Sequence, residues 1–473
     1  MTAPAGQAGP LGTRRAGVLL HVTSLPRREG PGDLGDAAYR FVDFLADAGC
    51  SVWQVLPLVP THEEDGSPYN GRSAMACNPD LISRERQADQ GLADPAGLGD
   101  AERTAFEAWC EERRDWLEPY VEFTALRELL DGAPWPTWEP GLRDGHEAEV
   151  AEALGPVRDR VDELRFEQWV FARQWDALRE YAASRGVLLF GDLPIFVSLD
   201  SADVWASREL FQLDERGRPI TVTGCPPDYF AKDGQRWNNP HYDWAAMAAD
   251  GFTWWRHRIA RQRELFDLVR IDHFRGFEAA WHVPSDAPTA RDGWWVEGPG
   301  AAALSALVEA AGPGTLVAED LGQITPEVEA LRRRFGLPGM KILQFAFDGS
   351  PDNPYLPAHH GEQSVVYTGT HDNDTTLGWW QELDETARAL VRSYLLDPDE
   401  PMPWALVRLA MDSTARLAVV PAQDLLGLGS ESRMNTPGTD TGNWAWQASP
   451  GSFGPDLAER VRALVTGAGR SSG

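Results

Sequence analysis

The stretch LVRIDHFRGF, residues 268–277, begins as a short apolar run and ends in charged side chains. Aliphatic residues dominate the run Leu268–Ile271, which is typical of a strand buried on both faces. Arg270 and Asp272 are two residues apart, so on a strand their side chains point to the same side. The stretch therefore predicts a buried strand with a basic and an acidic side chain at its carboxyl end.

Similar apolar runs recur along the chain and alternate with segments of helical spacing, such as residues 36–48. Short β-rich runs separated by helices favour parallel strands in βα units, and eight such strands are enough to close a barrel. We therefore predict an α/β fold, a (β/α)₈ TIM barrel with helical and irregular insertions between its strands. The eight runs are Ala16–Ser24, Ser51–Leu58, Val187–Ile195, Leu268–Ile271, Thr315–Ala318, Lys341–Phe345, Ser364–Tyr367 and Leu417–Val420.

The spacing of the runs predicts how the chain is divided. Residues 1–13 are mostly small and read as a disordered leader, and residues 14–473 read as one catalytic barrel. A stretch rich in Glu, Arg, Ala and Leu predicts a helical insertion at about 84–186. Glycines and prolines punctuate about 201–243, which predicts an irregular insertion over the substrate.

Composition excludes several classes of function. The chain has 43 basic and 72 acidic residues, a net charge of −29, and nucleic-acid binding needs a basic surface instead. The apolar run near the start, Gly17–Leu20, is too short for a signal peptide or a membrane span. Four scattered cysteines fit free thiols in a reducing compartment better than a disulfide or a zinc site. We expect a soluble protein of the cytoplasm.

Acidic residues follow four of the predicted strands: Asp192, Asp272, the pair Glu319–Asp320, and the cluster His371–Asp374. A single carboxylate after a strand is usually a helix N-cap. The active site of a TIM barrel, however, is built at the carboxyl ends of its strands, so four such clusters favour an active site.

The residue types suggest which chemistry the clusters perform. Arg270 beside Asp272 is expected to lower the pKa of that carboxyl and keep it anionic, as a nucleophile requires. Glu319 ends an apolar run, so burial is expected to raise its pKa and suit it to a general acid. One anionic and one protonated carboxyl make the glycosidase pair. A divalent-metal site at His371, Asp372 and Asp374 is the alternative, but the sequence has no H-x-H or H-E-x-x-H motif.

Several motifs resemble those of the 4-α-glucanotransferases, the amylomaltases or disproportionating enzymes related to the α-amylase group. The three that carry the resemblance are RIDHFRGF (270–277), EDLG (319–322) and GTHDND (369–374). Further matches are GDLPIFV (191–197), DSADVW (200–205), CPPDYF (225–230), QDLLGLG (423–429) and RMNTPG (433–438). The likeness extends from about Gly17 to Trp446, almost the whole chain.

The resemblance implies a role for each motif residue. It makes Asp272 the nucleophile, Glu319 the general acid/base, and Asp372 the residue that grips and distorts the sugar. The residues expected to bind substrate are Tyr69 as an aromatic platform, Asp192, Arg270 and His371 around the same glucosyl unit, Asn435, and Tyr229, Phe230 and Trp237 in a mobile loop. Core packing is the alternative for Tyr69 and Trp237.

The segment around Tyr69 departs from the family pattern. Arg72 and Cys77 are unusual there, and the preceding loop 61–65 is acidic where some relatives have Tyr and Gly. These differences put in doubt a secondary glucan site that would use a tyrosine of that loop, but they leave the catalytic residues untouched.

The resemblance implies a retaining transglycosylase. It would move α-1,4-glucan segments from a donor maltodextrin to the 4-hydroxyl of an acceptor glucan or of glucose. The two carboxyls supply the nucleophile and the proton, so we expect no cofactor and no metal. From the charge and the short apolar runs, we expect neither nucleic acid nor a membrane as a partner. The alternatives are an α-1,4-glucan hydrolase that uses water as acceptor and a non-catalytic glucan-binding protein.

Overall fold

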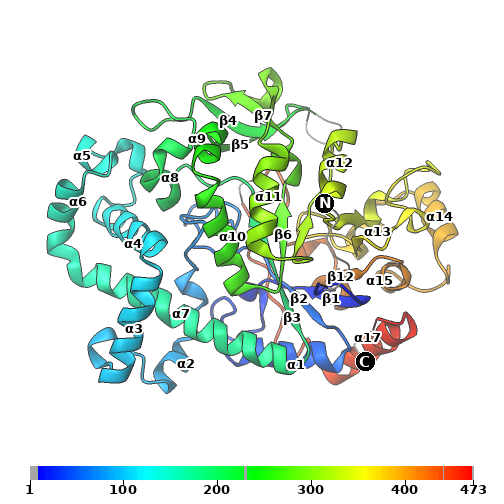
Figure 1. The fold of residues 1–473 in the computed structure, drawn as a ribbon. Helices are drawn as coiled ribbons and strands as arrows, with labels where there is room; N and C mark the ends of the chain where they lie inside the picture. Colours follow the sequence, from blue (N-terminus) through cyan, green and yellow to red (C-terminus); the bar gives the residue numbers. More distant parts are fainter. Residues whose placement is uncertain (1–8, 228–231, 440, 471–473) are drawn as a thin grey trace.

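A computed structural model describes residues 9–227, 232–439 and 441–470. Within them, eight parallel strands form one sheet in the order β10-β11-β12-β1-β2-β3-β6-β9 (Figure 1). Each predicted run overlaps one of these strands. The strands are β1 (Arg15–Leu19), β2 (Val52–Gln54), β3 (Leu188–Pro194), β6 (Leu268–Asp272), β9 (Leu316–Ala318), β10 (Gly339–Ile342), β11 (Ser364–Tyr367) and β12 (Leu417–Pro421).

The first and last strands of this order, β10 and β9, approach each other and nearly close the sheet. The Ala318 N–H donates to the Pro338 carbonyl oxygen at 2.9 Å. The Asp320 carboxylate accepts from the Met340 N–H at 2.7 Å and pairs with Arg332 at 3.0 Å. The predicted (β/α)₈ barrel is thereby confirmed. Between β9 and β10 it is closed by hydrogen bonds of the flanking loop and of the Asp320 side chain.

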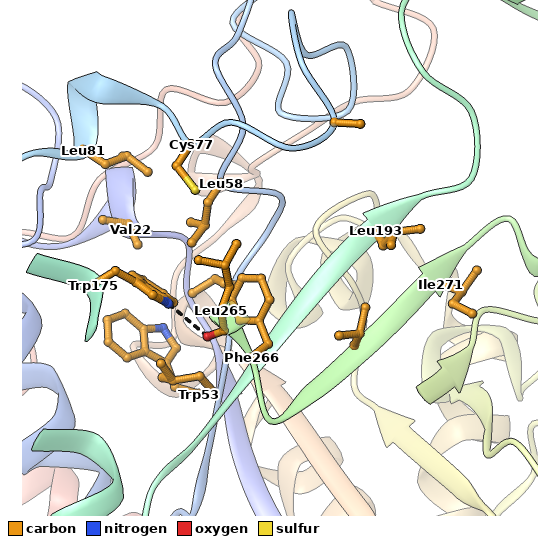
Figure 2. Packing of buried hydrophobic residues seen from close by; sticks show 14 of the residues in the cluster. Val22, Trp53, Leu58, Cys77, Leu81, Trp175, Leu193, Leu265, Phe266 and Ile271 are labelled. Atoms are coloured by element: carbon orange, nitrogen blue, oxygen red, sulfur yellow. Dashed lines mark hydrogen bonds between the residues drawn. The ribbon is translucent and has the colours of Figure 1, made fainter. Parts of the chain in front are cut away.

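Alternation along each strand sorts side chains between two layers. On β6, Leu268 belongs to the apolar cluster inside the barrel, whereas Val269 and Ile271 belong to the layer between strands and helices. Figure 2 shows Trp53, Trp175 and Phe266 in this outer layer, where the Trp175 indole donates to the Leu265 carbonyl oxygen at 2.9 Å. Arg270 and Asp272 therefore share the inward side of β6 with Leu268.

Helices surround the strands and fill the first insertion (Figure 1). The segment 84–186 holds α2 (Arg84–Asp89), α3 (Asp100–Glu112), α4 (Arg114–Leu129), α5 (Pro140–Arg143), α6 (Glu147–Leu154) and α7 (Arg158–Ser184). Further helices are α1 (Asp36–Asp47), α8 (Ala202–Ala206), α9 (Trp244–Ala249), α10 (Thr253–Leu265), α11 (Gly300–Ala311), α12 (Pro326–Arg334), α13 (Thr376–Glu382), α14 (Glu385–Tyr394), α15 (Trp404–Asp412), α16 (Ala422–Leu425) and α17 (Pro455–Gly467). No helix in the described part of the chain is long and apolar enough to cross a membrane.

The second insertion is more regular than its sequence indicates. It contributes β4 (Thr221–Cys225) and β5 (Gln235–Pro240) to an antiparallel sheet of order β5-β4-β7-β8. The other two strands, β7 (Ala279–Pro284) and β8 (Trp294–Glu297), come from beyond β6. Because β4 pairs with a strand far along the chain, local glycines and prolines predicted a loop where long-range pairing makes a sheet.

Candidate active site

The carboxyl ends of β3, β6 and β9 bring four of the predicted residues together. In the sheet register, Asp192 lies opposite Arg270, and Ile271 lies opposite Ala318, the residue before Glu319. The Glu319 N–H donates to the Ile271 carbonyl oxygen at 3.0 Å. Neighbouring strands thus place Asp192, Arg270, Asp272 and Glu319 at one edge of the barrel.

Arg270 links two of the carboxylates. Its buried guanidinium donates through Nη1 to both oxygens of Asp192, at 2.7 and 2.6 Å. Through Nη2 it pairs with Asp272 Oδ1 at 2.8 Å. Asp192 also accepts from the Tyr69 hydroxyl at 2.7 Å. One cation thereby holds Asp192 and Asp272 together.

The Glu319 carboxyl is fixed by backbone donors. Oε2 accepts from the His273 N–H and Oε1 from the Leu321 N–H, both at 2.7 Å. His273 follows Asp272 directly and has a left-handed φ of 51°, which turns the chain at the end of β6. Glu319 is therefore held beside the residue that follows the predicted nucleophile.

Both carboxyls of the pair have raised pKa values. Burial raises the pKa of Asp272 to about 8, and the neighbouring carboxylates Asp192, Glu319 and Asp372 add to the increase, although Arg270 lowers it. Burial also raises the pKa of Glu319, as the sequence predicted. The expectation that Arg270 brings the pKa of Asp272 below its ordinary value is therefore wrong, because burial outweighs the guanidinium. Arg270 divides its charge between Asp192 and Asp272, so it offsets only part of the effect of burial on Asp272.

A second group of predicted residues lies at the carboxyl end of β11. His371 Nε2 is 3.3 Å from Asp372 Oδ1, and the Asn435 amide donates to the same oxygen at 2.7 Å. The ring of Tyr69 stacks on that of His371, with centroids 5.0 Å apart and planes at 16°. The Tyr69 hydroxyl reaches Asp192, so Tyr69 connects the two groups of residues.

Of the three aromatic residues expected in the substrate loop, the structure describes Trp237. It lies on β5, partly exposed, and its ring packs edge-on against His273 with centroids 4.8 Å apart. Tyr229 and Phe230 lie outside the described residues. The second insertion thus reaches the catalytic strand end through Trp237.

The metal alternative finds little support in the arrangement of its side chains. Asp374 accepts from the Ser430 hydroxyl and the Thr375 N–H, both at 2.7 Å, instead of sharing a centre with Asp372. Among the residues that the structure describes, no group of three His, Cys, Asp or Glu side chains is arranged to hold a metal ion.

One residue of the site was missed by the sequence reasoning. Trp444 packs against both Tyr69 and His371, with ring centroids 5.7 and 5.9 Å away. Its sequence neighbours are ordinary for a surface turn, and only the fold brings it to Tyr69 and His371. The one available signal was its place near the end of the resemblance, just before Trp446.

A model of the 4-alpha-glucanotransferase family matches residues 20–98 and 96–452 of the chain. The chain belongs to this family. Two similar 4-alpha-glucanotransferases come from Thermus thermophilus, 48% identical over 96% of this chain and 98% of its own, and from Synechocystis, 46% identical over 93% and 95%. These matches confirm 4-alpha-glucanotransferase activity and do not favour the hydrolase alternative.

Solved structures agree with the family. The amylomaltase from Streptococcus agalactiae, determined in complex with acarbose, superposes with a TM-score of 0.92 at 32% identity, over 97% of this chain and all of that one. An amylomaltase from Corynebacterium glutamicum, at 19% identity and a TM-score of 0.75 over 98% of this chain and 75% of that one, shares the fold. The solved structures thus support the barrel fold, and the family model and the sequence relatives support the transferase activity.

Proposed function

We propose that the enzyme transfers α-1,4-glucan segments from a maltodextrin donor to the 4-hydroxyl of an acceptor glucan or of glucose, with Asp272 as nucleophile and Glu319 as general acid/base. The observation that carries this proposal is the shared strand end at which Arg270 orients Asp272 and two backbone N–H groups orient Glu319. The acarbose bound to the Streptococcus agalactiae amylomaltase supports a sugar ligand of this class.

In the first step, Asp272 attacks the anomeric carbon while Glu319 gives its proton to the departing 4-oxygen. The bond to the leaving glucan breaks and a β-glucosyl ester forms on Asp272. This step needs one proton on the pair, located on Glu319. The upward shift of the Glu319 pKa favours the protonated form of Glu319 that this step requires.

In the second step, Glu319 acts as a base. It takes the proton from the 4-hydroxyl of the incoming sugar, whose oxygen attacks the anomeric carbon and releases Asp272. The α configuration is restored after two inversions. We expect the two carboxyl groups to be roughly 5–5.5 Å apart when a sugar is bound, as retention requires.

The remaining predicted residues surround the reacting sugar in this proposal. Asp372 would accept hydrogen bonds from its hydroxyls, with Asn435 and His371 holding the carboxylate in place. Tyr69 would supply an aromatic face, pinned at its hydroxyl by Asp192. Trp237, together with Tyr229 and Phe230, would cover the acceptor side.

The proposal extends to the whole chain and its surroundings. Residues 14–473 would form one catalytic unit, in which the insertion 84–186 supports the barrel and the insertion 201–243 covers the substrate. Free thiols and an acidic surface fit the reducing cytoplasm and argue against nucleic-acid partners.

Incubation with maltotriose tests the proposal directly. Transfer produces glucose together with longer maltodextrins, while the number of reducing ends stays constant. Hydrolysis raises the number of reducing ends and yields no longer chains. The same incubation with Asp272→Asn serves as the control. Absence of any longer product from the unmodified enzyme would refute the transfer proposal.

A further inference from the structure

Three aromatic rings stand together at the end of the site that holds Asp372. Tyr69 and His371 form a nearly parallel stack. Trp444 lies against both rings at an interplanar angle of 39° in each case. These residues come from three separate parts of the chain, so the cluster exists only in the folded protein.

Trp444 adopts a backbone conformation that is costly for a bulky side chain. Its φ is 62°, in the left-handed region that favours glycine. Such conformations persist where the surroundings determine them, and they gather at functional sites. A glycine at this position would have the same backbone without strain, yet the chain places the largest aromatic ring here.

The backbone around Trp444 is tied down on both sides. Its N–H donates to the Met434 carbonyl oxygen at 2.7 Å. The carbonyl oxygen of Trp446 accepts from the Ser24 hydroxyl at 2.8 Å, and the Ala448 N–H donates to the Ser24 carbonyl oxygen at 3.0 Å. A segment that is hydrogen-bonded to Ser24, beyond the end of β1, therefore holds the ring against Tyr69 and His371.

The stacked pair needs such a support. Tyr69 has a side-chain hydrogen bond to Asp192 at its hydroxyl tip, and His371 approaches Asp372 through Nε2. Contacts at the tips fix where each ring points but leave it free to tilt. A third ring against the sides of both removes that freedom.

We propose that Trp444 is a positioning residue that fixes the tilt of the Tyr69–His371 stack, and with it the glucosyl unit that the stack holds. This inference rests on the proposed function of Tyr69 and His371 as sugar-binding residues. The competing explanation is that Trp444 only packs its own segment and acts through stability.

Three substitutions at one position separate the two explanations. Trp444→Phe keeps a ring, Trp444→Ala removes the ring and keeps the strained φ, and Trp444→Gly removes both ring and strain. We expect the glycine variant to have a higher Tm than the alanine variant. We also expect both to lose about 10- to 100-fold in kcat/KM for maltotriose, and the phenylalanine variant to keep most of the activity. Recovery of activity in the glycine variant along with its Tm would overturn the proposal.

The titration of His371 gives a readout that does not depend on turnover. Burial lowers the pKa of His371 among the charged neighbours Asp372, Arg270 and Asp192, with His21 nearby. Removing Trp444 hydrates the imidazole, so its pKa, measured by NMR, should rise in the glycine variant and remain low in the phenylalanine variant. An unchanged pKa in the glycine variant would show that Trp444 does not support the ring. If the unmodified enzyme failed to make longer products from maltotriose, the proposed function would fail, whereas this titration would still test the contact.

Discussion

At the scale of single residues, the chemistry depends on how five charged groups share one site. Arg270 contacts Asp192 and Asp272, and Glu319 and Asp372 are near enough to raise the pKa of Asp272. Carboxylates close to Asp272 oppose its ionisation, and the single guanidinium of Arg270 offsets only part of that effect. Burial and the neighbouring carboxylates therefore favour the protonated forms of Asp272 and Glu319.

Replacing Asp272 with Asn should separate activity from stability. The amide is a far weaker nucleophile, so nearly all transfer should be lost. The folded-state pKa of Asp272, about 8, lies above its ordinary value, so ionisation destabilises the folded protein as pH rises above about 4. The variant should consequently have a higher Tm than the unmodified enzyme at pH 7 and an equal one at pH 4. Activity above about a tenth of normal would mean that another group attacks.

Asp192 should control the acid limb of the pH profile. Its charge raises the pKa of Asp272, and it occupies Nη1 of Arg270. Asp192→Asn removes that charge and leaves Arg270 to pair with Asp272, so the pKa of Asp272 should fall. The low-pH limb of kcat/KM, where Asp272 becomes protonated, should then move to lower pH, at a reduced maximal rate because Tyr69 loses its acceptor. A limb that stays in place or moves upward would argue against Asp272 as its origin.

At the scale of elements, the sequence was sufficient for the barrel but not for the sheet beside it. Each barrel strand is a local apolar run, and Asp192, Asp272 and Glu319 lie in or directly after three of these strands, so they could be predicted. The sheet beside the barrel depends on the pairing of β4 with β7, two strands far apart in the sequence, and β8 joins it by pairing with β7. No local pattern in the sequence indicates the pairing of β4 with β7. Trp444 was missed for the same reason, because its partners are Tyr69 and His371.

The position of the antiparallel sheet leads to a prediction about whether a sugar or water accepts the glucosyl unit. Trp237 on β5 covers His273 next to the nucleophile. Trp237→Ala should open this side to water, so the ratio of transferred to hydrolysed glucosyl units from maltotriose should fall several-fold. Trp294→Ala, on the exposed edge strand β8 of the same sheet, is the matched control and should leave the ratio unchanged. Equal ratios in the two variants would mean that residues other than Trp237 keep water out of the site.

At the scale of the whole molecule, the two ends of the barrel should serve different purposes. Catalytic groups gather at the carboxyl ends of the strands, whereas residues close to the two ends of the chain contact each other at the amino end of β1. Arg470, fully buried, donates to the carbonyl oxygens of Met411 and Ser413 at 2.6 Å and of Arg15 at 2.9 Å. Nearby, Arg14 donates to the Ala468 carbonyl oxygen at 2.7 Å.

This division predicts that Arg470→Ala destabilises the fold without altering the chemistry. The substitution leaves three carbonyl oxygens without the guanidinium and opens a cavity, which should cost about 2–4 kcal/mol of unfolding free energy. Denaturant unfolding should show this loss, whereas kcat and the transfer ratio at 25 °C should match those of the unmodified enzyme. Asp272→Asn should give the opposite result, because it should lose turnover while its Tm is not lowered. A fall in kcat for Arg470→Ala under conditions where the variant is fully folded would show that the amino end of the barrel shapes the catalytic end, and that the two ends are not independent.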